Sequence, residues 1–439
     1  MSHAVVIGGS IAGLLAARVL LNHFDRVTLL ERDRIPSSPG PRPGVPQAQH
    51  VHALLLRGHQ ILESLFPGLT TDLMAQGALR LDWTADWRFL TQWDWMPRHV
   101  SRLEGLICSR LLLEWYLRDR LLQRPGFQLQ EATLATGLVA QGEPPWVTGV
   151  VWASDGQSQT LAADWVVDAS GRNSKLADWL VDLGFQRPPA TTVNSFLGYA
   201  SRWYRRPAQA PLEGLIVAAK PGVTRRGGVL YPVEGDRCVI TLSGIEKDYP
   251  SANEAEFWAF ANSLRDPTIA NIIQAWEPIA PIQCYRRTEN HWRHYEKLPA
   301  LPDGIVALGD AACAFNPIYG QGMTVAALQA QALGSLLTRA RQDGGVPSAM
   351  TRQWFRRAAR IADVAWQAVS VEDFRHPELA GTRPISLRPL QWYMDHVQRA
   401  TYRSAAVTKQ FYRVLNFVDP PTALLRPRMA AAVLLRGRA

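Results

Sequence analysis

A glycine-rich turn near the N-terminus constrains the fold of this chain more than any other sequence feature. It follows a β-branched run at residues 4–7 and precedes small and apolar residues at 14–24, so the predicted order is strand, tight turn, helix. Such a turn directs backbone N–H groups and a helix N-terminus at a pyrophosphate, which then needs no side-chain cation. The residues expected to contact the ligand are Gly8, Gly9, Ser10, Ile11, Ala12 and Gly13.

A second predicted strand, at residues 27–30, is followed by Glu31 and Arg32. Glu31 lies eighteen positions after Gly13, which is the usual place for a carboxylate that accepts hydrogen bonds from a ribose hydroxyl. Ser10 replaces the middle glycine of the usual G-x-G-x-x-G pattern. The N-terminal segment therefore predicts a dinucleotide site, and by itself leaves both NAD and FAD open.

Residues 165–174 predict a strand that runs into a turn of small residues. Asp168 and Gly171 stand at this turn, where a backbone can approach a ligand closely. Both are therefore expected to contact the cofactor.

A third segment favours FAD over NAD. The buried run at 304–308 ends in Gly309 and Asp310, and a predicted helix covers 324–337. An acid at a strand end can bind a ribityl hydroxyl. Backbone amides at a helix N-terminus can face the electron-rich pyrimidine edge of an anionic reduced flavin. The contacts expected just before the helix and in its first turn are Gly320, Gly322 and Met323.

These motifs, in the order G-x-S-x-x-G, V-V-D-A-S-G-R and G-D-A-A-x-x-x-N-P-x-x-G-x-G-M, resemble the para-hydroxybenzoate-hydroxylase-type FAD monooxygenase superfamily over residues 1 to about 340. Shorter stretches are similar to bacterial flavin epoxidases that act on polyene precursors of polyether polyketides. These stretches are G-V-P-Q-A-Q-H-V-H at 44–52, S-R at 109–110, V-L-Y-P at 229–232 and D-F-R-H-P at 373–377. The resemblance implies that Arg42 and Arg110 reach the FAD phosphates or ribityl chain, and that Pro317 lies near the reactive edge of the isoalloxazine.

The resemblance also implies the chemistry. It predicts a monooxygenase that transfers one oxygen atom from O2, through a flavin C4a-hydroperoxide, to a lipophilic alkene by epoxidation or to an aromatic ring by hydroxylation. The flavin performs the difficult step, so no catalytic side chain is nominated. Ser170 stands where these hydroxylases usually carry the Asp of an Asp-Gly pair. The electrons are therefore expected from NAD(P)H, either directly or through a separate flavin reductase.

Two other functions share the same FAD segments. One is a geranylgeranyl-reductase-like enzyme that acts on isoprenoid double bonds, and the other is a flavoprotein whose FAD is not redox-active. The segment W-D-W-M-P at 93–97 resembles the W-x-W-x-I-P signature of flavin halogenases, but it is one residue short and lies too early in the chain. We interpret this similarity as coincidental.

The middle of the chain predicts a second sheet. Aromatic residues alternate between 82 and 97, and strand-like runs at 229–231 and 238–242 flank a turn at 234–236. Trp93, Trp95 and Tyr231 are candidates for a lipophilic substrate wall, with a purely structural core as the equal alternative. The predicted fold is α/β, with a Rossmann-like FAD-binding domain formed by residues 1–75, 101–185 and 300–345, an interleaved β-sheet substrate-binding domain formed by 76–100 and 186–299, and a helical C-terminal region at 346–439.

The net charge of +9 requires an explanation. The arginines are scattered and no basic helix or aromatic-basic motif is present, which argues against nucleic acid. The basic C-terminal end, with Arg426, Arg428, Arg436 and Arg438, is either a solvated surface or a peripheral contact with anionic lipid. Without a signal peptide or a long apolar run, a cytoplasmic location is expected. The four widely spaced cysteines and the three histidines between 50 and 59 form no metal-site pattern, so no metal is expected.

Overall fold

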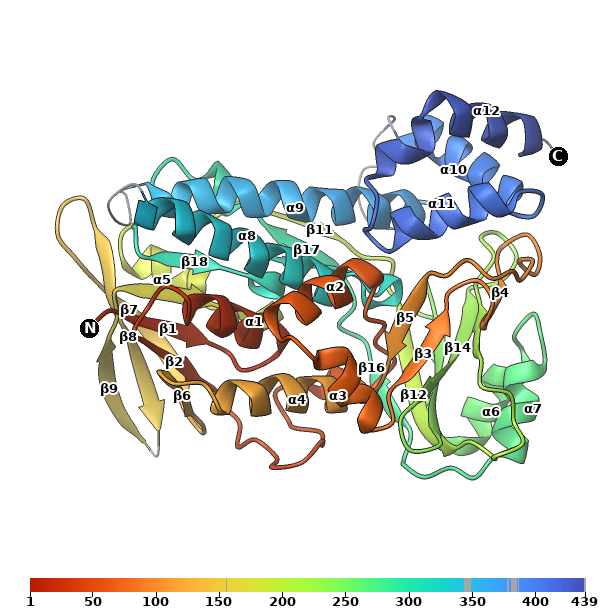
Figure 1. The fold of residues 1–439 in the computed structure, drawn as a ribbon, viewed down its shortest axis with the longest axis horizontal. Helices are drawn as coiled ribbons and strands as arrows, with labels where there is room; N and C mark the ends of the chain where they lie inside the picture. The colour runs from red at the N-terminus through yellow and green to blue at the C-terminus, as the bar shows by residue number, and fades with distance from the viewer. Residues whose placement is uncertain (155, 343–348, 377–378, 380–384, 386, 438–439) are drawn as a thin grey trace.

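The computed structural model describes residues 1–154, 156–342, 349–376, 379, 385 and 387–437. Pro377 of the D-F-R-H-P motif and the basic Arg438 lie outside this part of the chain, as do small parts of the two predicted units that meet near residue 345. Figure 1 shows a parallel sheet with its helices at one end of the molecule and a second, antiparallel-rich sheet at the other.

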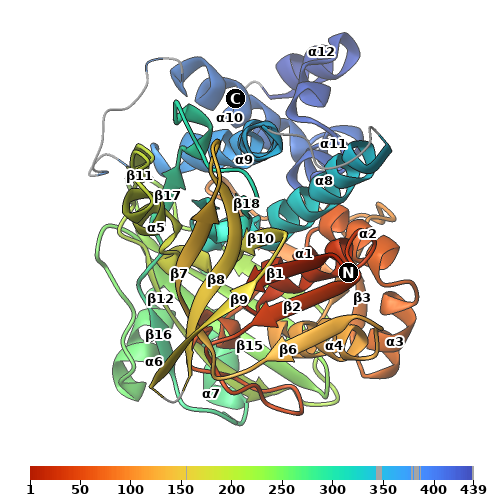
Figure 2. The same ribbon diagram turned by 90° about the vertical axis from the view of Figure 1, so that its left-hand side faces the viewer.

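A five-stranded parallel sheet forms the first layer, in the order β18-β10-β1-β2-β6. Its central strands are wholly buried, as expected for a parallel sheet that is covered on both faces. Figure 2 shows the antiparallel meander β7-β8-β9 against one face and helices α1 and α8 against the other. The bounds are β1 His3–Ile7, β2 Arg26–Leu30, β6 Phe127–Gln130, β10 Trp165–Asp168, β18 Ile305–Ala307, β7 Leu134–Gln141, β8 Trp146–Ser154, β9 Gln157–Ala162, α1 Ile11–Leu20 and α8 Gly322–Gln342.

The register of this sheet brings the predicted segments together. Ile7 is the neighbour of both Leu30 and Asp168, and Asp168 is the neighbour of Ala307. The carboxyl ends of these four parallel strands therefore meet at one edge, where open α/β sheets bind their ligands. Both helices begin earlier than the apolar pattern predicts, because each starts directly after its turn, at Ile11 and Gly322.

The second sheet has six strands in the order β16-β12-β15-β14-β13-β4. Successive residues of its strands point to opposite faces of the sheet and pack into two different hydrophobic cores. Leu230 and Ile240 pack under helices α6 and α7, whereas Tyr231 and Val239 face the opposite side with Trp87. The bounds are β4 Trp87–Leu90, β12 Gly198–Arg205, β13 Gly214–Val217, β14 Arg226–Val233, β15 Arg237–Gly244, β16 Gln283–Tyr285, α6 Glu254–Asn262 and α7 Thr268–Ala275.

Smaller elements connect these two sheets. Strand β17 (Asn290–Arg293) pairs with both β11 (Ala190–Val193) and β19 (Cys313–Ala314), so it holds the middle of the third FAD segment. The short pair of β3 (Leu79–Asp82) and β5 (Glu104–Ile107) leads into α4 (Arg110–Leu122). Helices α2 (Leu56–Leu65), α3 (Leu69–Ala75) and α5 (Leu176–Asp182) complete this part of the molecule.

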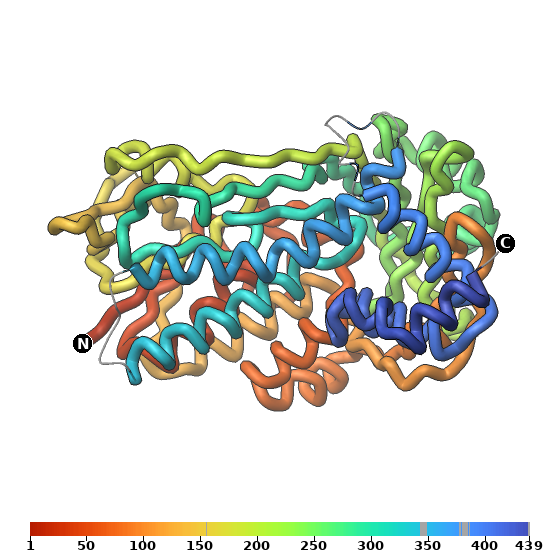
Figure 3. Tube along the Cα trace, turned by 90° about the horizontal axis from the view of Figure 1, so that it is seen from above, coloured from red at the N-terminus to blue at the C-terminus, as the bar shows by residue number. Residues whose placement is uncertain are grey.

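The C-terminal region is helical, as predicted. Helix α9 (Met350–Asp373) runs beside α8 along the length of the molecule (Figure 3) and ends near the second sheet. Helices α10 (Leu387–Thr401), α11 (Ala405–Leu415) and α12 (Pro427–Arg436) form a bundle around Val397, Val407 and Val433. No helix in the described ranges is long and apolar enough to span a bilayer. The α/β class, the Rossmann-like layer, the second sheet and the helical C-terminus are confirmed, while the exact domain limits stay a prediction.

Candidate functional site

A cavity of about 390 Å³ opens at the carboxyl edge of the parallel sheet and reaches the second sheet. All three predicted FAD segments contribute to its wall, together with both arginines that the family resemblance singled out. Every predicted cofactor residue lines the cavity except Gly13 and Asp168. The lining ones are Gly8, Gly9, Ser10, Ile11, Ala12, Glu31, Arg32, Arg42, Arg110, Gly171, Gly309, Asp310, Pro317, Gly320, Gly322 and Met323.

The N-terminal turn depends on two glycines for close packing. Gly8 has φ +100°, and a Cβ on it would lie 2.6 Å from the carbonyl oxygen of Ala169 on the neighbouring strand. A Cβ on Gly13 would lie 1.8 Å from the carbonyl oxygen of Gly8. The absence of a side chain at Gly13 therefore allows helix α1 to pack closely against the turn. Gly13 supports the cavity wall in this way without lining the cavity.

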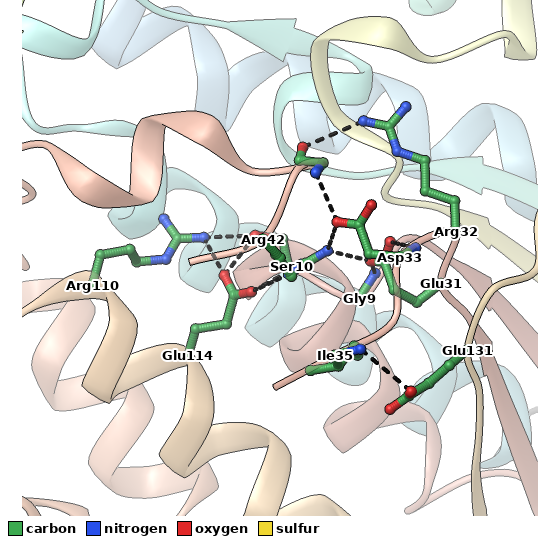
Figure 4. Close-up of polar contacts among 11 residues, drawn as sticks. Gly9, Ser10, Glu31, Arg32, Asp33, Ile35, Arg42, Arg110, Glu114 and Glu131 are labelled. Carbon is green, nitrogen blue, oxygen red and sulfur yellow. Dashed lines mark hydrogen bonds and ion pairs between the residues drawn. The ribbon is translucent and has the colours of Figure 1, made fainter. Parts of the chain in front are cut away.

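Glu31 fixes the other side of this turn. Its Oε2 accepts a hydrogen bond from the backbone N–H of Gly9 at 2.8 Å, and its Oε1 accepts one from the N–H of Asp33 at 2.9 Å (Figure 4). Arg42 approaches the same carboxylate at 2.9 Å. The side chain is buried at the end of β2 and lines the cavity, so it stands where a ribose hydroxyl is expected.

A carboxylate that sequence reasoning missed binds both of the arginines that the family resemblance singled out. Glu114, on α4, lies within 2.9 Å of Arg42 and 2.8 Å of Arg110, and it accepts a hydrogen bond from Ser10 Oγ at 2.8 Å (Figure 4). Burial alone would raise the pKa of Glu114, but Arg110 and Arg42 outweigh it and hold that pKa below its usual value. Burial would likewise lower the pKa of Arg42, but Glu114 and Glu31 raise it. The sequence contained part of the evidence for the contact between Arg110 and Glu114, because Glu114 lies one helical turn after Arg110.

Asp168 has a different place from the predicted one. Its side chain is fully buried beneath the strand ends and accepts hydrogen bonds from the hydroxyls of Ser170 and Ser174. Burial raises its pKa, although these two hydroxyls oppose the shift. Asp168 therefore shapes the turn that carries Gly171 and is not part of the cavity wall, and its contact with the cofactor stays a prediction.

The third segment forms the opposite end of the cavity. Asp310 lies 3.7 Å from the Nε of Arg172, and the N–H of Gly309 donates to Gln329 on α8 at 2.8 Å. The turn η5 (Pro317–Tyr319) and Gly320, with φ +66°, lead directly into the N-terminus of α8. Helix α8 therefore directs the positive end of its dipole at the cavity, which favours negative charge there.

The residues present fit FAD. Within the described part of the chain, Arg110 Nε and Gln321 Oε1 are buried without a hydrogen-bond partner, and both residues line the cavity. An unpaired buried donor and an unpaired buried acceptor each cost about 1–3 kcal/mol, so a ligand that pairs both is favoured. FAD offers phosphate oxygens to the first and hydroxyl or ring N–H donors to the second. No group of three His, Cys, Asp or Glu side chains in the described ranges is arranged for a metal ion.

The second sheet contributes two tyrosines that the sequence did not single out. Tyr199 on β12 and Tyr285 on β16 are directly paired across these strands, stack at 5.4 Å and line the cavity. The His50 ring packs edge-on against Tyr199 at 4.6 Å, and its Nδ1 lies 2.7 Å from Ser201 Oγ. No sequence pattern pointed to the pairing of Tyr199 with Tyr285, which depends on the register of β12 and β16.

The predicted substrate residues lie elsewhere. Trp93 is 37% exposed and stacks under Arg399 of α10, Trp95 packs under Arg88, and Tyr231 is in the core behind Trp87. None of the three lines the cavity. The aromatic alternation identified a strand correctly, but it did not reveal which face of the sheet meets the cavity, so a substrate role for these three residues stays a prediction without support from the cavity wall.

Comparisons with known proteins agree with this site. The family model described as FAD binding domain matches residues 1–368. Protein Rv3254 of Mycobacterium tuberculosis (strain ATCC 25618 / H37Rv) is 34% identical over 428 residues, which are 95% of this chain and 90% of that protein. The solved structure of the flavin-dependent brominase Bmp2 superposes with a TM-score of 0.69 at 15% identity, covering 94% of each chain. PqsL, a probable FAD-dependent monooxygenase from Pseudomonas aeruginosa, superposes with a TM-score of 0.63 at 16% identity, covering 85% of this chain and 98% of PqsL.

The two structural similarities establish the fold alone, because the identities are low. The family match is stronger evidence, since it includes all three segments that form the cavity wall. The chain belongs to the FAD binding domain family.

Proposed function

We propose that this protein is a monooxygenase that inserts one oxygen atom from O2 into a lipophilic alkene or an aromatic ring. The observation that carries the proposal is the stacked pair of Tyr199 and Tyr285, which forms an aromatic wall in the same cavity as the FAD segments. FAD supplies the oxygen-activating chemistry when bound. The chain's own residues need to hold the flavin, exclude water and orient the substrate against this wall.

The charge state of this wall favours an uncharged substrate. Burial raises the pKa of the Tyr199 phenol and lowers the pKa of His50 to about 4, so both are neutral at neutral pH. A charged substrate group placed against these rings would lose its hydration without gaining an ion pair from the rings themselves. A planar or apolar group gains dispersion and stacking contacts instead. The motif similarity to the polyether epoxidases further favours an alkene.

NAD(P)H is the proposed source of electrons. Arg32, Lys175 and Arg287 line the cavity and supply positive charge for the phosphates of such a donor. Ser170 provides no carboxylate at the position that is usually Asp, and its hydroxyl is bound to Asp168. Direct reduction by NAD(P)H and delivery by a separate flavin reductase therefore both belong to the proposal.

We also infer a cytoplasmic location with a peripheral contact to anionic lipid through α12. Leu434 and Leu435 of this helix are 39% and 72% exposed, beside the exposed Arg428 and Arg436. Apolar side chains flanked by arginines suit a negatively charged membrane surface. Co-sedimentation with phosphatidylglycerol vesicles but not with phosphatidylcholine vesicles is expected, and absence from both pellets would contradict the contact.

Isotope labelling tests the oxygen insertion. The FAD-loaded protein is supplied with NADPH or NADH, with and without a flavin reductase, and with a panel of alkenes and phenols under ¹⁸O2. We expect a product that carries one ¹⁸O atom. A hydrogenated product without label would indicate an isoprenoid-type reductase, a halogenated product that requires added bromide or chloride would indicate a halogenase, and no turnover in any arm would indicate a non-redox flavoprotein.

A further inference from the structure

A buried carboxylate from the C-terminal region contacts the cavity turn of the third FAD segment. Asp373, the last residue of α9, is 2% exposed. Its Oδ1 accepts hydrogen bonds from Tyr319 Oη at 2.8 Å and Asn316 Nδ2 at 3.2 Å, and its Oδ2 accepts one from Asn290 Nδ2 at 2.6 Å. Three donors from two separate segments therefore meet at one carboxylate.

These contacts hold the turn at both ends. Asn316 stands before turn η5 and Tyr319 closes it, while Pro317 and Gly320 beside them line the cavity. Asn290 reinforces the arrangement, because its Oδ1 accepts the backbone N–H of Asn316 at 2.7 Å. The position of the turn relative to the cavity is thus set by α9, which lies beyond all three FAD segments in the sequence.

The charges around Asp373 do not neutralise it. Among the described residues no Lys, Arg or His side chain lies within ion-pair distance of its carboxylate. The adjacent Arg375 pairs with Glu372 and Asp395, each at 2.8 Å, and His376 lies 3.8 Å from Glu246, which also pairs with Arg225. Burial of an uncompensated carboxylate costs several kcal/mol, so packing alone does not favour an aspartate at this position.

We propose that Asp373 is a positioning residue for the cofactor, and that its ionised carboxylate holds the turn at 316–320 in the shape that accepts the flavin end of FAD. All three partners approach as donors, and an ionised carboxylate accepts from all of them at once. Protonation places a hydrogen on one oxygen and removes an acceptor from one donor. The inference depends on FAD binding and is independent of oxygen insertion, so a failure of the proposed reaction would leave it intact.

The pH dependence of FAD binding provides a signature that a purely structural role lacks. Burial raises the pKa of Asp373 to about 6, against the hydrogen bonds from Tyr319, Asn290 and Asn316. If FAD requires the ionised form, the affinity for FAD falls by about tenfold for each pH unit below that pKa. Glu372, the preceding residue, accepts a hydrogen bond from Arg375 Nε and, within the described ranges, none from the turn, so it provides a control for the loss of a carboxylate at this end of α9.

The experiment is an FAD titration of the full-length apoprotein, followed by flavin fluorescence, between pH 5 and pH 8. We expect the wild-type Kd to rise about tenfold from pH 7 to pH 5. Asp373→Asn is expected to raise the Kd at pH 7 at least to the wild-type pH 5 value and to abolish the pH dependence. Glu372→Gln is expected to keep the wild-type Kd at pH 7 and to move the midpoint of the profile to lower pH, because the Glu372 charge raises the pKa of Asp373. Wild-type affinity and profile in Asp373→Asn, or an equal loss in Glu372→Gln, would overturn the proposal.

A second variant covers the case in which Asp373→Asn does not fold. Tyr319→Phe removes one hydrogen bond that favours the ionised carboxylate, so it raises the pKa of Asp373 further. The midpoint of the pH profile for FAD binding is then expected to move to higher pH than in the wild type. An unchanged midpoint in Tyr319→Phe would overturn the proposal by itself.

Discussion

The guanidinium of Arg42 donates two hydrogen bonds to a single oxygen of Glu114, from Nε at 3.1 Å and from Nη2 at 2.9 Å, and both side chains are buried. The other oxygen of Glu114 binds Arg110 and Ser10. One carboxylate therefore joins α4, the loop that carries Arg42 and the N-terminal turn. The two arginines expected to reach the FAD phosphates or ribityl chain are thus held in place by Glu114.

Removal of the Glu114 charge is expected to destabilise the protein. Glu114→Gln leaves two buried guanidinium groups with less compensation, and breaking a buried ion pair costs about 3–5 kcal/mol. Urea unfolding should show a decrease of that order in the free energy of unfolding. Glu131→Gln is the control, because Glu131 is exposed and its carboxylate accepts, within the described part of the chain, a single hydrogen bond, from the N–H of Ile35 at 3.3 Å. Equal stability of the two variants would contradict the central role of Glu114.

Substitution by alanine is expected to have opposite effects on stability at two helical glycines, Gly13 and Gly334. Gly13→Ala places a Cβ 1.8 Å from the Gly8 carbonyl oxygen, so the turn must shift and both stability and FAD affinity should fall. In Gly334→Ala on α8 the nearest atom is Val19 Cβ at 3.5 Å, an ordinary contact, and the helix should gain up to about 1 kcal/mol. Thermal unfolding and FAD titration of both variants check this pair. A stable, FAD-binding Gly13→Ala protein would show that the turn is looser than the structure indicates.

Asp310→Ala is expected to weaken FAD retention by about tenfold or more, because the carboxylate that faces the cavity and Arg172 is lost. The ratio of flavin to protein after purification, together with the Kd for FAD, measures the effect. Asp182→Ala removes an exposed carboxylate outside the cavity wall and should retain wild-type flavin content. Unchanged flavin in Asp310→Ala would remove this residue from the site.

Tyr285→Leu is expected to affect the substrate more than the cofactor. Loss of the aromatic wall should raise the substrate KM by up to about tenfold, since tenfold corresponds to about 1.4 kcal/mol, the upper end of the range for one aromatic contact. The Kd for FAD should change little. Tyr249→Leu is the matched control, because Tyr249 stacks with Arg286 outside the cavity wall. A larger effect on FAD than on KM would place the substrate elsewhere.

The buried His50 predicts a loss of stability on acidification. Its folded-state pKa is about 4, below the ordinary 6.5, so the folded protein binds fewer protons than the unfolded chain between these values. The contribution of His50 is therefore complete above pH 6.5 and decreases as the pH falls toward 4, by on the order of 2–3 kcal/mol. His50→Gln should flatten the difference in unfolding free energy between pH 7 and pH 4.5, while His396→Gln on α10 should not. Parallel profiles for wild type and His50→Gln would contradict this.

Local patterns predicted the parts of the site that lie within single segments. The turn at Gly8 to Gly13, the acid at Glu31 and the approach to α8 were visible because spacing along the chain fixes them, and parallel strands then bring their ends to one edge. Contacts set by tertiary packing were not visible. Tyr199 meets Tyr285 only through the register of β12 and β16, and Asp373 reaches Asn316 only because α9 runs beside α8.

The tryptophan-rich stretch between residues 82 and 97 is a second case in which the sequence did not predict tertiary contacts. Trp83 and Trp87 stack at 5.1 Å in the core, which agrees with the structural alternative, whereas Trp93 and Trp95 pack against arginines away from the cavity. Alternation along a strand reveals that one face is buried, but it carries no information on what covers that face.

The most direct test of the account is an experimental structure of the protein with FAD bound. We predict one FAD in the cavity, with its pyrophosphate at the turn formed by Gly9 and Ser10, its adenosine ribose at Glu31 and its isoalloxazine beside Pro317, Gly320 and Gly322. The Tyr199 and Tyr285 pair should lie beyond the flavin ring and remain free for substrate. A flavin bound outside this cavity, or bound in the reverse direction with its ring at Glu31, would contradict the assignment of all three segments.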